Sequence, residues 1–419
     1  MLASVASLII LGFDIVPDRT LDDGMKIPGL NFDALRTSAR RALPTLIFWV
    51  VCFFLIDRFK PQRLMIWILA LLWGGCIAIG LSYYLNTWVG QQMAVIDEMS
   101  GTAAIRIAVF VAPFVEEGTK ACIIFFIVVI DRNRFTSRVS GAVVGGLAGA
   151  GFAFTENIIY YARAIVYGSY TSSAGDVAAA LDYLVFLRGV LTAFGHPLFT
   201  LMTGVGVGFA VASRSKMVRI LAPAAGFLMA AFLHMFFNFQ ASVIPEERLL
   251  PLILIIAWPV VIGVAIRLIM SMLRQGKIIA ARLEDYAAAG WLPDNYPSAF
   301  SRLRSRAWTV VMSLWHGSVV KTWMMQVRVT ELAMIADGIS RGTIDEGALL
   351  REYDLINEIN ELDQAGGLSS GQGLRPYWPW NADLHRNDRP NAVHLPAHTT
   401  TAEPPVKYSA VDPRWQAPS

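Results

Sequence analysis

The chain has 419 residues, of which 55% are hydrophobic and only 16% are charged, and its formal net charge is +3. This composition is too apolar for an ordinary soluble domain, and the small net charge does not favour a partner made of nucleic acid. Cys52, Cys76 and Cys122 lie in apolar stretches at a spacing that matches no zinc or disulfide framework. The composition therefore predicts a multi-span membrane protein.

The first 16 residues are apolar apart from Asp14. They lack a basic leading region and a small-residue cleavage site, so a secretory signal is poorly supported. A short segment that dips into the membrane is an alternative interpretation. We expect residues 1–41 to form an N-terminal segment with some membrane association.

Seven apolar runs of about 14–29 residues follow, and a membrane-spanning helix needs about 20 residues. In chain order they are Leu43–Ile56, Leu64–Leu85, Ala103–Ile130, Gly141–Tyr161, Leu184–Ala212, Val218–Gln240 and Leu252–Met272. The third run is long, and Pro113 can break it into two helices. The pattern predicts an all-α fold, a polytopic bundle of about seven transmembrane helices within residues 42–275.

The loops between these runs alternate in charge. Basic residues follow the first, third, fifth and seventh runs, beginning with Arg58, Arg132, Arg214 and Arg274, whereas acidic residues collect in the other loops. Because basic loops face the cytoplasm, the alternation predicts a multi-pass protein of the cytoplasmic membrane with a cytoplasmic C-terminus. Three arginines that precede Leu43 on the outer side conflict with this rule.

The third run carries Glu116, Glu117 and Lys120, although each charge inside a bilayer costs roughly 2.5–3.5 kcal/mol. Adjacent helical residues lie about 100° apart, so the two carboxylates cannot point the same way. Glu116 and Lys120 are four residues apart and share a face. We expect one carboxylate to face a reaction site while a neighbour holds the other. The alternative is a buried salt bridge that fixes the helix register.

The fourth run leads to another acid. Gly141, Gly145 and Gly149 form a stripe of small residues that lets a second helix approach closely. Glu156 continues this face seven residues after Gly149, and Asn157 adds an amide beside it. The stripe predicts a packing surface that ends at an ionisable group, with a polar helix end as the alternative.

Histidines interrupt the fifth and sixth runs. His196 precedes Pro197, and a proline disfavours helical geometry at the residue before it, so we expect a kink that aims the imidazole inward. His234 and Asn238 are four residues apart and share a face. Neutral imidazole is the commonest metal ligand and suits zinc. For each histidine, an interhelical hydrogen bond is the alternative.

After the last run the chain becomes more polar. Residues 276–365 have helix-forming composition with mixed charges and predict a helical cytoplasmic region. Trp291, Trp308, Trp315 and Trp323 mark either a membrane-surface face or a small helical core. Residues 366–419 are rich in Pro, Gly, Asn and His, which predicts a disordered tail.

The polar residues of the runs suit one reaction. Two histidines and a carboxylate can hold a zinc ion with an open fourth position, and water bound there loses a proton near neutral pH. A second carboxylate can act as general base. We therefore predict hydrolysis of a peptide bond in a membrane-protein substrate, with metal ligands Glu156, His196 and His234.

At these residues the chain resembles a known family. Residues 112–120 read APFVEEGTK and resemble the EExxK motif of PrsW-type intramembrane proteases. The sequence FAFTEN, which ends at Glu156 and Asn157, resembles the family's FxxxEN motif. His196 and the His234–Asn238 pair resemble its later histidine motifs. The resemblance covers about residues 100–272 and extends in outline to type II CAAX prenyl proteases.

The resemblance implies a polytopic metalloprotease of the bacterial cytoplasmic membrane. The best-known role in this family is cleavage of a membrane-bound anti-sigma factor, which makes a regulatory membrane protein the implied substrate. By analogy with the CAAX proteases, Glu116 is the implied general base, with Glu117 as its catalytic partner. Lys120, Asn157 and Asn238 are then supporting residues. The resemblance implies no oligomeric state.

Two other functions fit the polar residues. Intramembrane acids and histidines also form proton relays, as in a proton-coupled transporter. The halves of the chain show no internal repeat, which weakens this interpretation. A non-catalytic scaffold could bind a membrane partner through the glycine faces, but it needs no acid pair beside histidines. The sequences HExxH and GxSG, which mark other intramembrane proteases, are absent.

Overall fold

The computed structural model describes the protein in seven stretches. They are residues 2–20, 26–59, 61–96, 103–130, 138–170, 176–341 and 347–364. The predicted disordered tail of residues 366–419 lies outside these stretches, so its structure stays a prediction. Contacts divide the chain into two compact units. The membrane unit comprises residues 1–57 and 62–268, and the C-terminal unit comprises residues 58–61 and those from 269 onward.

Almost every described element of the membrane unit is a helix. The unit contains α1 (Leu2–Ile15), α2 (Phe32–Ile56), α3 (Leu64–Leu72), α4 (Ile79–Ile96), α5 (Ala103–Arg106), α6 (Ala112–Ile130), α7 (Arg138–Tyr170), α8 (Val177–Phe186), α9 (Gly195–Val211), α10 (Lys216–Val243) and α11 (Glu246–Leu252). Wider π-helical turns join some of them: η1 (Trp73–Ala78), η2 (Ile107–Val111), η3 (Leu187–Leu191) and η4 (Ile253–Ala257). The strands β1 (Arg19–Thr20) and β2 (Lys26–Ile27) form one small antiparallel hairpin.

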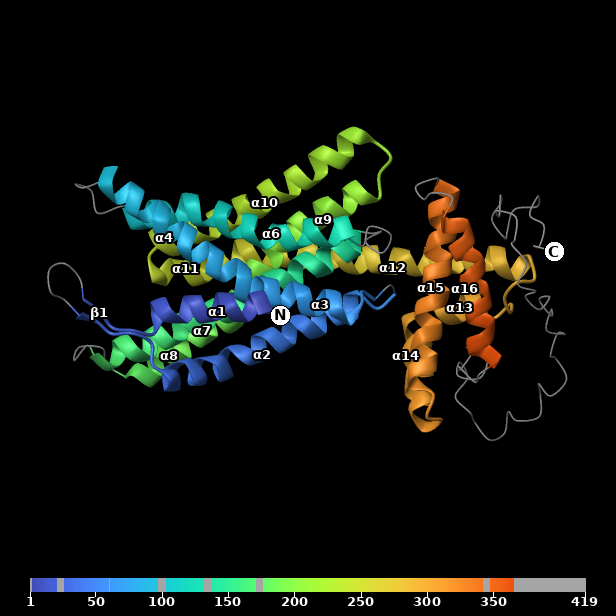
Figure 1. Ribbon diagram of the computed structural model, residues 1–419, viewed down its shortest axis with the longest axis horizontal. Coiled ribbons are helices and arrows are strands. Elements are labelled where there is room, and N and C mark those ends of the chain that lie inside the picture. Colours follow the sequence, from blue (N-terminus) through green and yellow to red (C-terminus); the bar gives the residue numbers. More distant parts are fainter. Residues whose placement is uncertain are drawn as a thin grey trace. The chain divides into compact units, whose positions relative to one another are not determined.

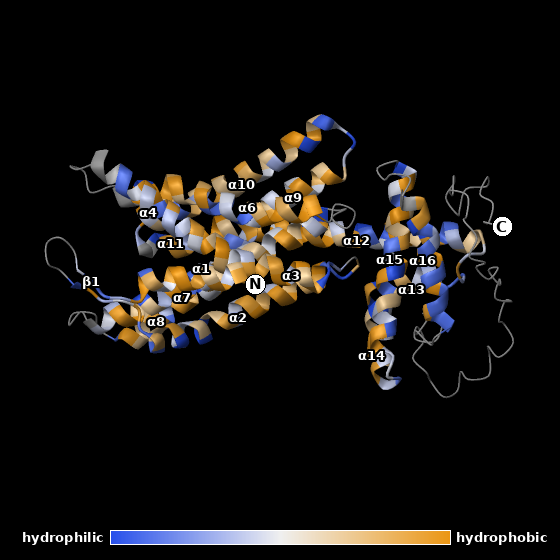
Figure 2. Cartoon of the chain, viewed as in Figure 1, coloured by the Kyte–Doolittle hydropathy of each residue, from blue (hydrophilic) through white to orange (hydrophobic). Residues whose placement is uncertain are grey.

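Six described helices are long and apolar enough to cross a membrane. They occupy Phe32–Ile56, Leu64–Gln92, Arg138–Ser169, Val177–Val211, Lys216–Val243 and Arg248–Ala288. The predicted all-α membrane bundle is confirmed, and its apolar helices are visible in Figure 2. The remaining predicted span, Ala103–Ile130, forms α5, η2 and α6, and it carries the three charges of the Glu116 region. Its three closely spaced charges separate it from the six other helices, whose most apolar windows carry at most two charged residues.

Helix α7 is the centre of the membrane unit, and 72% of its most apolar window is buried. It lies beside α2 and α9 (Figure 1). The glycine stripe makes the contact with α9 possible. A Cβ on Gly141 would stand 1.9 Å from the carbonyl oxygen of Gly204, and a Cβ on Gly149 would stand 2.2 Å from that of His196. The predicted close-packing surface is therefore confirmed, and it brings Glu156 and His196 to the same level.

The predicted kink at His196 was wrong in its position. The helical path breaks at Thr192–Phe194, and α9 begins at Gly195, so His196 and Pro197 both lie in its first turn. A first turn tolerates proline because its backbone N–H groups have no intrahelical partner there. The break therefore moves upstream of the histidine, which keeps helical geometry.

The C-terminal unit is built from the end of α12 (Trp258–Ala288), α13 (Tyr296–Phe300), α14 (Leu303–Trp315), α15 (Val319–Arg341) and α16 (Gly347–Gln364). Its apolar core includes Phe59, which comes from the loop after α2. A fully buried Arg306 binds this loop: its Nη2 donates to the carbonyl oxygens of Arg58 and Phe59 at 3.3 and 3.4 Å. Burial lowers the pKa of Arg306 to about 9. Because this pKa is still above 7, the guanidinium stays charged at neutral pH.

The four tryptophans of this unit differ in their burial. Trp291 packs against the core, and the guanidinium of Arg58 lies over the ring of Trp323 at 4.9 Å. Trp308 and Trp315 instead expose 40% and 82% of their surface. The small helical core is therefore present, and two tryptophans remain outside it.

Candidate metal centre

The two adjacent glutamates of α6 have different surroundings, as their 100° separation predicts. Both oxygens of Glu117, which is fully buried, have partners: Oε1 is 2.7 Å from Lys120 Nζ and 3.1 Å from His234 Nδ1, and Oε2 accepts a 2.8 Å hydrogen bond from Thr200 Oγ1. Glu117 therefore has no free oxygen for a substrate or a proton. Its side chain therefore connects the helices α6, α9 and α10.

Glu116 has the opposite arrangement. Its Oε2 is buried and accepts no hydrogen bond from any described residue. Two nitrogens, Lys120 Nζ and His234 Nε2, each lie 3.8 Å from it. A buried oxygen without a donor is costly, so such a group in a native fold calls for an explanation, and one explanation is an ion.

His196 from α9 contacts a glutamate carboxylate with one ring nitrogen and a lysine amino group with the other. Its Nε2 lies 2.8 Å from Glu156 Oε2, and its Nδ1 lies 3.0 Å from Lys120 Nζ. Because a carboxylate only accepts hydrogen bonds, we assign the ring proton to Nε2. The lone pair of Nδ1 then faces Lys120 and the interior of the site.

Glu156 is therefore engaged from two directions. Besides His196, it accepts a 2.5 Å hydrogen bond from Arg188 Nη2, and Arg188 Nε donates to Asn157 Oδ1 at 2.9 Å. This brings together the predicted pair Glu156 and Asn157 through a residue that the sequence analysis did not assign. The available signal was a charged Arg188 inside the otherwise apolar run Leu184–Ala212.

His234 comes from α10, and its ring is stacked on Phe199 with centroids 5.0 Å apart. With Nδ1 bonded to the Glu117 carboxylate, Nε2 carries the lone pair and faces Glu116 Oε2. Asn238, one turn along α10, donates from Nδ2 to the carbonyl oxygen of Ala108 at 2.8 Å. This contact fastens α10 to η2.

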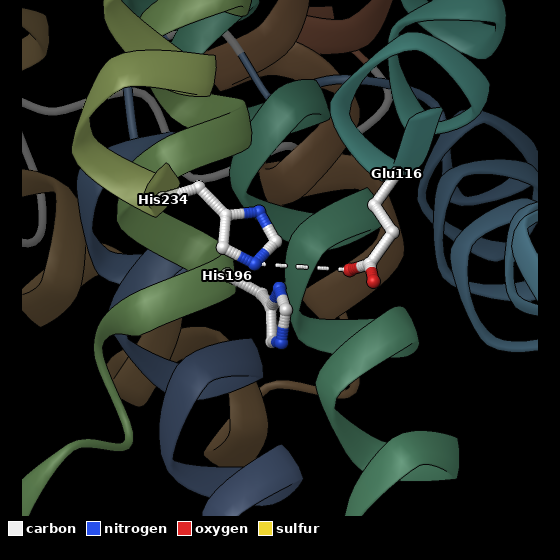
Figure 3. Close-up of side chains that lie close together, drawn as sticks. All are labelled: Glu116, His196 and His234. Carbon is white, nitrogen blue, oxygen red and sulfur yellow. Dashed lines mark ion pairs between the residues drawn. The ribbon is translucent and has the colours of Figure 1, made fainter. Parts of the chain in front are cut away.

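The ligand atoms of Glu116, His196 and His234 converge (Figure 3). One such atom from each residue lies within 4.8 Å of the other two. Glu156, predicted as a ligand, is not part of this group among the described residues, because it binds the far side of the His196 ring.

Two imidazole nitrogens and one carboxylate oxygen fit a divalent metal, since catalytic zinc sites use three such ligands and keep a fourth position open. The carboxylates on the outer ring nitrogens add the orienting partners that metal-bound histidines usually have. One feature opposes the fit: Lys120 Nζ occupies the direction of the His196 Nδ1 lone pair. Binding of an ion through Nδ1 requires this 3.0 Å contact to open.

Comparisons with known proteins agree with this chemistry. The model of the PrsW family intramembrane metalloproteases matches residues 60–264, which include every residue of the site. Neither the curated proteins nor the solved structures contain a significant match. The family match favours the enzyme over the transporter and the scaffold. Over residues 60–264, which are just under half of the chain, the protein therefore matches the PrsW family of intramembrane metalloproteases, a family of membrane-embedded hydrolases.

Proposed function

We propose that this protein hydrolyses a peptide bond of a membrane-protein substrate at a zinc centre held by Glu116, His196 and His234. The observation that carries the proposal is the convergence of three lone pairs, of which the Glu116 oxygen has no hydrogen-bond partner among the described residues. Zinc suits a donor set of imidazole nitrogen and carboxylate oxygen. When bound, the metal supplies a water molecule of lowered pKa and polarises the scissile carbonyl.

The remaining residues of the site orient these donors. Glu117 accepts from His234 Nδ1, and Glu156 accepts from His196 Nε2, so each carboxylate fixes one tautomer and one ring direction. Arg188 holds Glu156 in turn. Lys120 offsets the negative charge of the two glutamates on its own helix. This division differs from the sequence-based assignment, in which Glu156 was a ligand and Glu116 the general base.

Two roles of Glu116 can be separated experimentally. As a metal ligand, it is needed for tight binding of the ion. As a general base, it takes a proton from water while other groups hold the ion, and its loss leaves the metal in place. The position of its unpartnered oxygen, facing both histidines, favours the ligand role.

The proposed location is the bacterial cytoplasmic membrane with a cytoplasmic C-terminus, on the basis of the basic loops. The apolar helices around the site favour a substrate that is itself membrane-bound, such as the anti-sigma factors or other regulatory proteins cleaved by this family.

The test uses the full-length protein purified in lipid nanodiscs. We expect about one zinc ion per chain in the parent, and strongly reduced metal in His234→Ala and Glu116→Gln. His316→Ala is the matched control, because His316 is exposed in the C-terminal unit and its Nδ1 lies 2.8 Å from the Met312 carbonyl oxygen. Retention of the ion by Glu116→Gln with loss of cleavage would restore the general-base role.

Cleavage itself is tested by comparing membrane fragments in cells that produce the parent or Glu116→Gln. A substrate is identified as a protein that accumulates uncut only with the variant. The proposed function is wrong if the folded parent binds no divalent metal, or if Glu116→Gln and His234→Ala cleave as fast as the parent.

A further inference from the structure

Helix α14 of the C-terminal unit is polar on its buried side. Its four buried residues are Ser305, Arg306, Thr309 and Ser313. Arg306 Nη1 donates to Thr330 Oγ1 at 2.7 Å, and the side-chain amide of Gln326 donates to Thr309 Oγ1 at 2.8 Å. The contact between α14 and α15 is thus a hydrogen-bonded network. A water-soluble helix normally shows the reverse pattern, with apolar residues inside.

The apolar residues of α14 lie on its outer side. We define the α14 face as Trp308, Val311, Leu314 and Trp315, which expose 40%, 45%, 64% and 82% of their surface. At 100° per residue these four positions fall within an arc of about 120°, opposite the buried polar residues. Val320 and Met324 on α15 are exposed as well, at 71% and 42%. An apolar stripe with two exposed tryptophans marks a surface that another apolar phase covers.

The charged residues around the α14 face indicate which apolar phase covers it. From Asn295 to Thr330 the sequence contains Arg302, Arg304, Arg306, Lys321 and Arg328 and no Asp or Glu. Arg302, Arg304 and Lys321 are exposed. Such a surface would repel a second copy of itself, whereas it complements an anionic lipid headgroup layer.

The length of α14 limits how it can meet a bilayer. Its 13 residues extend about 20 Å, which is shorter than the roughly 30 Å of the hydrocarbon core. The helix is therefore suited to lie in the interface, with tryptophans at headgroup level and basic residues on the phosphates. The acidic helix α16 offers a contrast: it buries Leu355, Ile356 and Ile359, and exposes Asp354 and Glu361.

We propose that the α14 face binds the surface of an anionic bilayer and makes the C-terminal unit a second, peripheral membrane-contact site. The chain is already anchored by its spanning helices, so this contact needs little intrinsic affinity to form. The site lies outside residues 60–264 and does not depend on the proposed metal chemistry.

A photo-crosslinking experiment on the full-length protein tests this proposal. Benzoylphenylalanine is placed at Leu314, or at Glu361 on α16 as the matched exposed control, in nanodiscs that contain phosphatidylglycerol. We expect phospholipid adducts at Leu314 and few at Glu361. Equal lipid adducts at both positions, or none at either, would overturn the proposal. A crosslink from Leu314 to a second copy or to another protein would do the same.

The electrostatic part is tested with Arg302→Glu and Arg304→Glu together, two exposed residues outside the catalytic site. We expect the lipid adduct at Leu314 to fall about 25-fold, since each of the two basic residues contributes roughly a fivefold preference for an anionic surface and the two factors multiply. Replacing phosphatidylglycerol by phosphatidylcholine should have a similar effect. If neither the double substitution nor the lipid replacement lowers the adduct yield, the partner is not an anionic surface.

Discussion

Both units of this protein bury charged side chains in apolar surroundings, but they satisfy them differently. In the C-terminal unit, the terminal nitrogens of Arg306 donate only to neutral acceptors, namely backbone carbonyls and the hydroxyl of Thr330. In the membrane unit, Glu116 and two imidazoles keep lone pairs that point at one another. Arg306 Nε has no partner among the described residues, but both terminal nitrogens of its guanidinium are bonded, which suits a structural role. The convergent unused lone pairs of an acid and two imidazoles indicate a site for chemistry instead.

The adjacent glutamates of α6 show the same contrast, because Glu117 has partners for both oxygens and Glu116 has an oxygen without one. Glu116→Gln should lower cleavage by about 10²–10⁴-fold while leaving the free energy of unfolding nearly unchanged, because its oxygen Oε2 has no donor to lose. Glu117→Gln should instead cost roughly 3 kcal/mol of stability, since Lys120 loses its nearest carboxylate. Cleavage rates and urea denaturation of both variants check this. Equal destabilisation by the two changes would break the comparison.

The counterpart in the C-terminal unit is Arg306→Met, which keeps an unbranched side chain but removes every donor. We expect a loss of roughly 3 kcal/mol, because several buried acceptors are left without their partner. Pulse proteolysis of the full chain in increasing urea measures the effect on this unit. Zinc content should not change, and a variant as stable as the parent would contradict the structural role.

A substitution of Arg188 tests whether its hydrogen bonds to Glu156 and Asn157 orient the His196 ring. Arg188→Lys keeps the charge but cannot bind Glu156 and Asn157 together. We expect a 10–100-fold loss of zinc affinity or of kcat with little change in KM, which is the usual cost of removing an outer partner of a metal-bound histidine. If KM rises alone, Arg188 contacts the substrate instead.

Tyr296 gives a pH test that is confined to the C-terminal unit. Burial and a hydrogen bond to Asp363 raise the pKa of Tyr296 far above its ordinary value of 10.0. Above pH 10 the unfolded chain loses this proton and the folded chain keeps it, so stability falls as pH rises. The slope is about 1.4 kcal/mol per pH unit. Pulse proteolysis between pH 8 and 11 should show this loss for the parent and a smaller one for Tyr296→Phe.

The smallest effect is expected from deletion of residues 366–419, which lie outside the family match over residues 60–264. Basal cleavage should stay within about twofold of the parent, in line with most changes outside buried or catalytic features being nearly neutral. The measurement is fragment release in membranes at matched protein levels. A truncated protein that inserts and folds but does not cleave would give the tail a role in the enzyme.

The sequence was sufficient to predict the features that follow from residue periodicity and from the energetic cost of placing charges in apolar segments. Charges in apolar runs identified Glu116 and Glu156, and the four-residue glycine spacing predicted that the helix now seen as α7 has a close-packing face, although not which helix packs there. The hydrogen-bond partners could not be predicted, because they depend on helix rotation and on side chains far away in the chain. Thr200 is 83 residues from Glu117, and Arg188 is 32 residues from Glu156. The break before Gly195 also escaped prediction, since proline was taken to act on the residue before it.

The bond from Arg306 to the loop after α2 links parts of the chain that are 247 and 248 residues apart. During synthesis, this loop leaves the ribosome long before α13 to α16 exist. The core of the C-terminal unit includes Phe59, so this unit cannot complete its packing until both the loop after α2 and the helices α13 to α16 have been made. Folding of the C-terminal unit is therefore coupled to a segment that is synthesised more than 200 residues earlier.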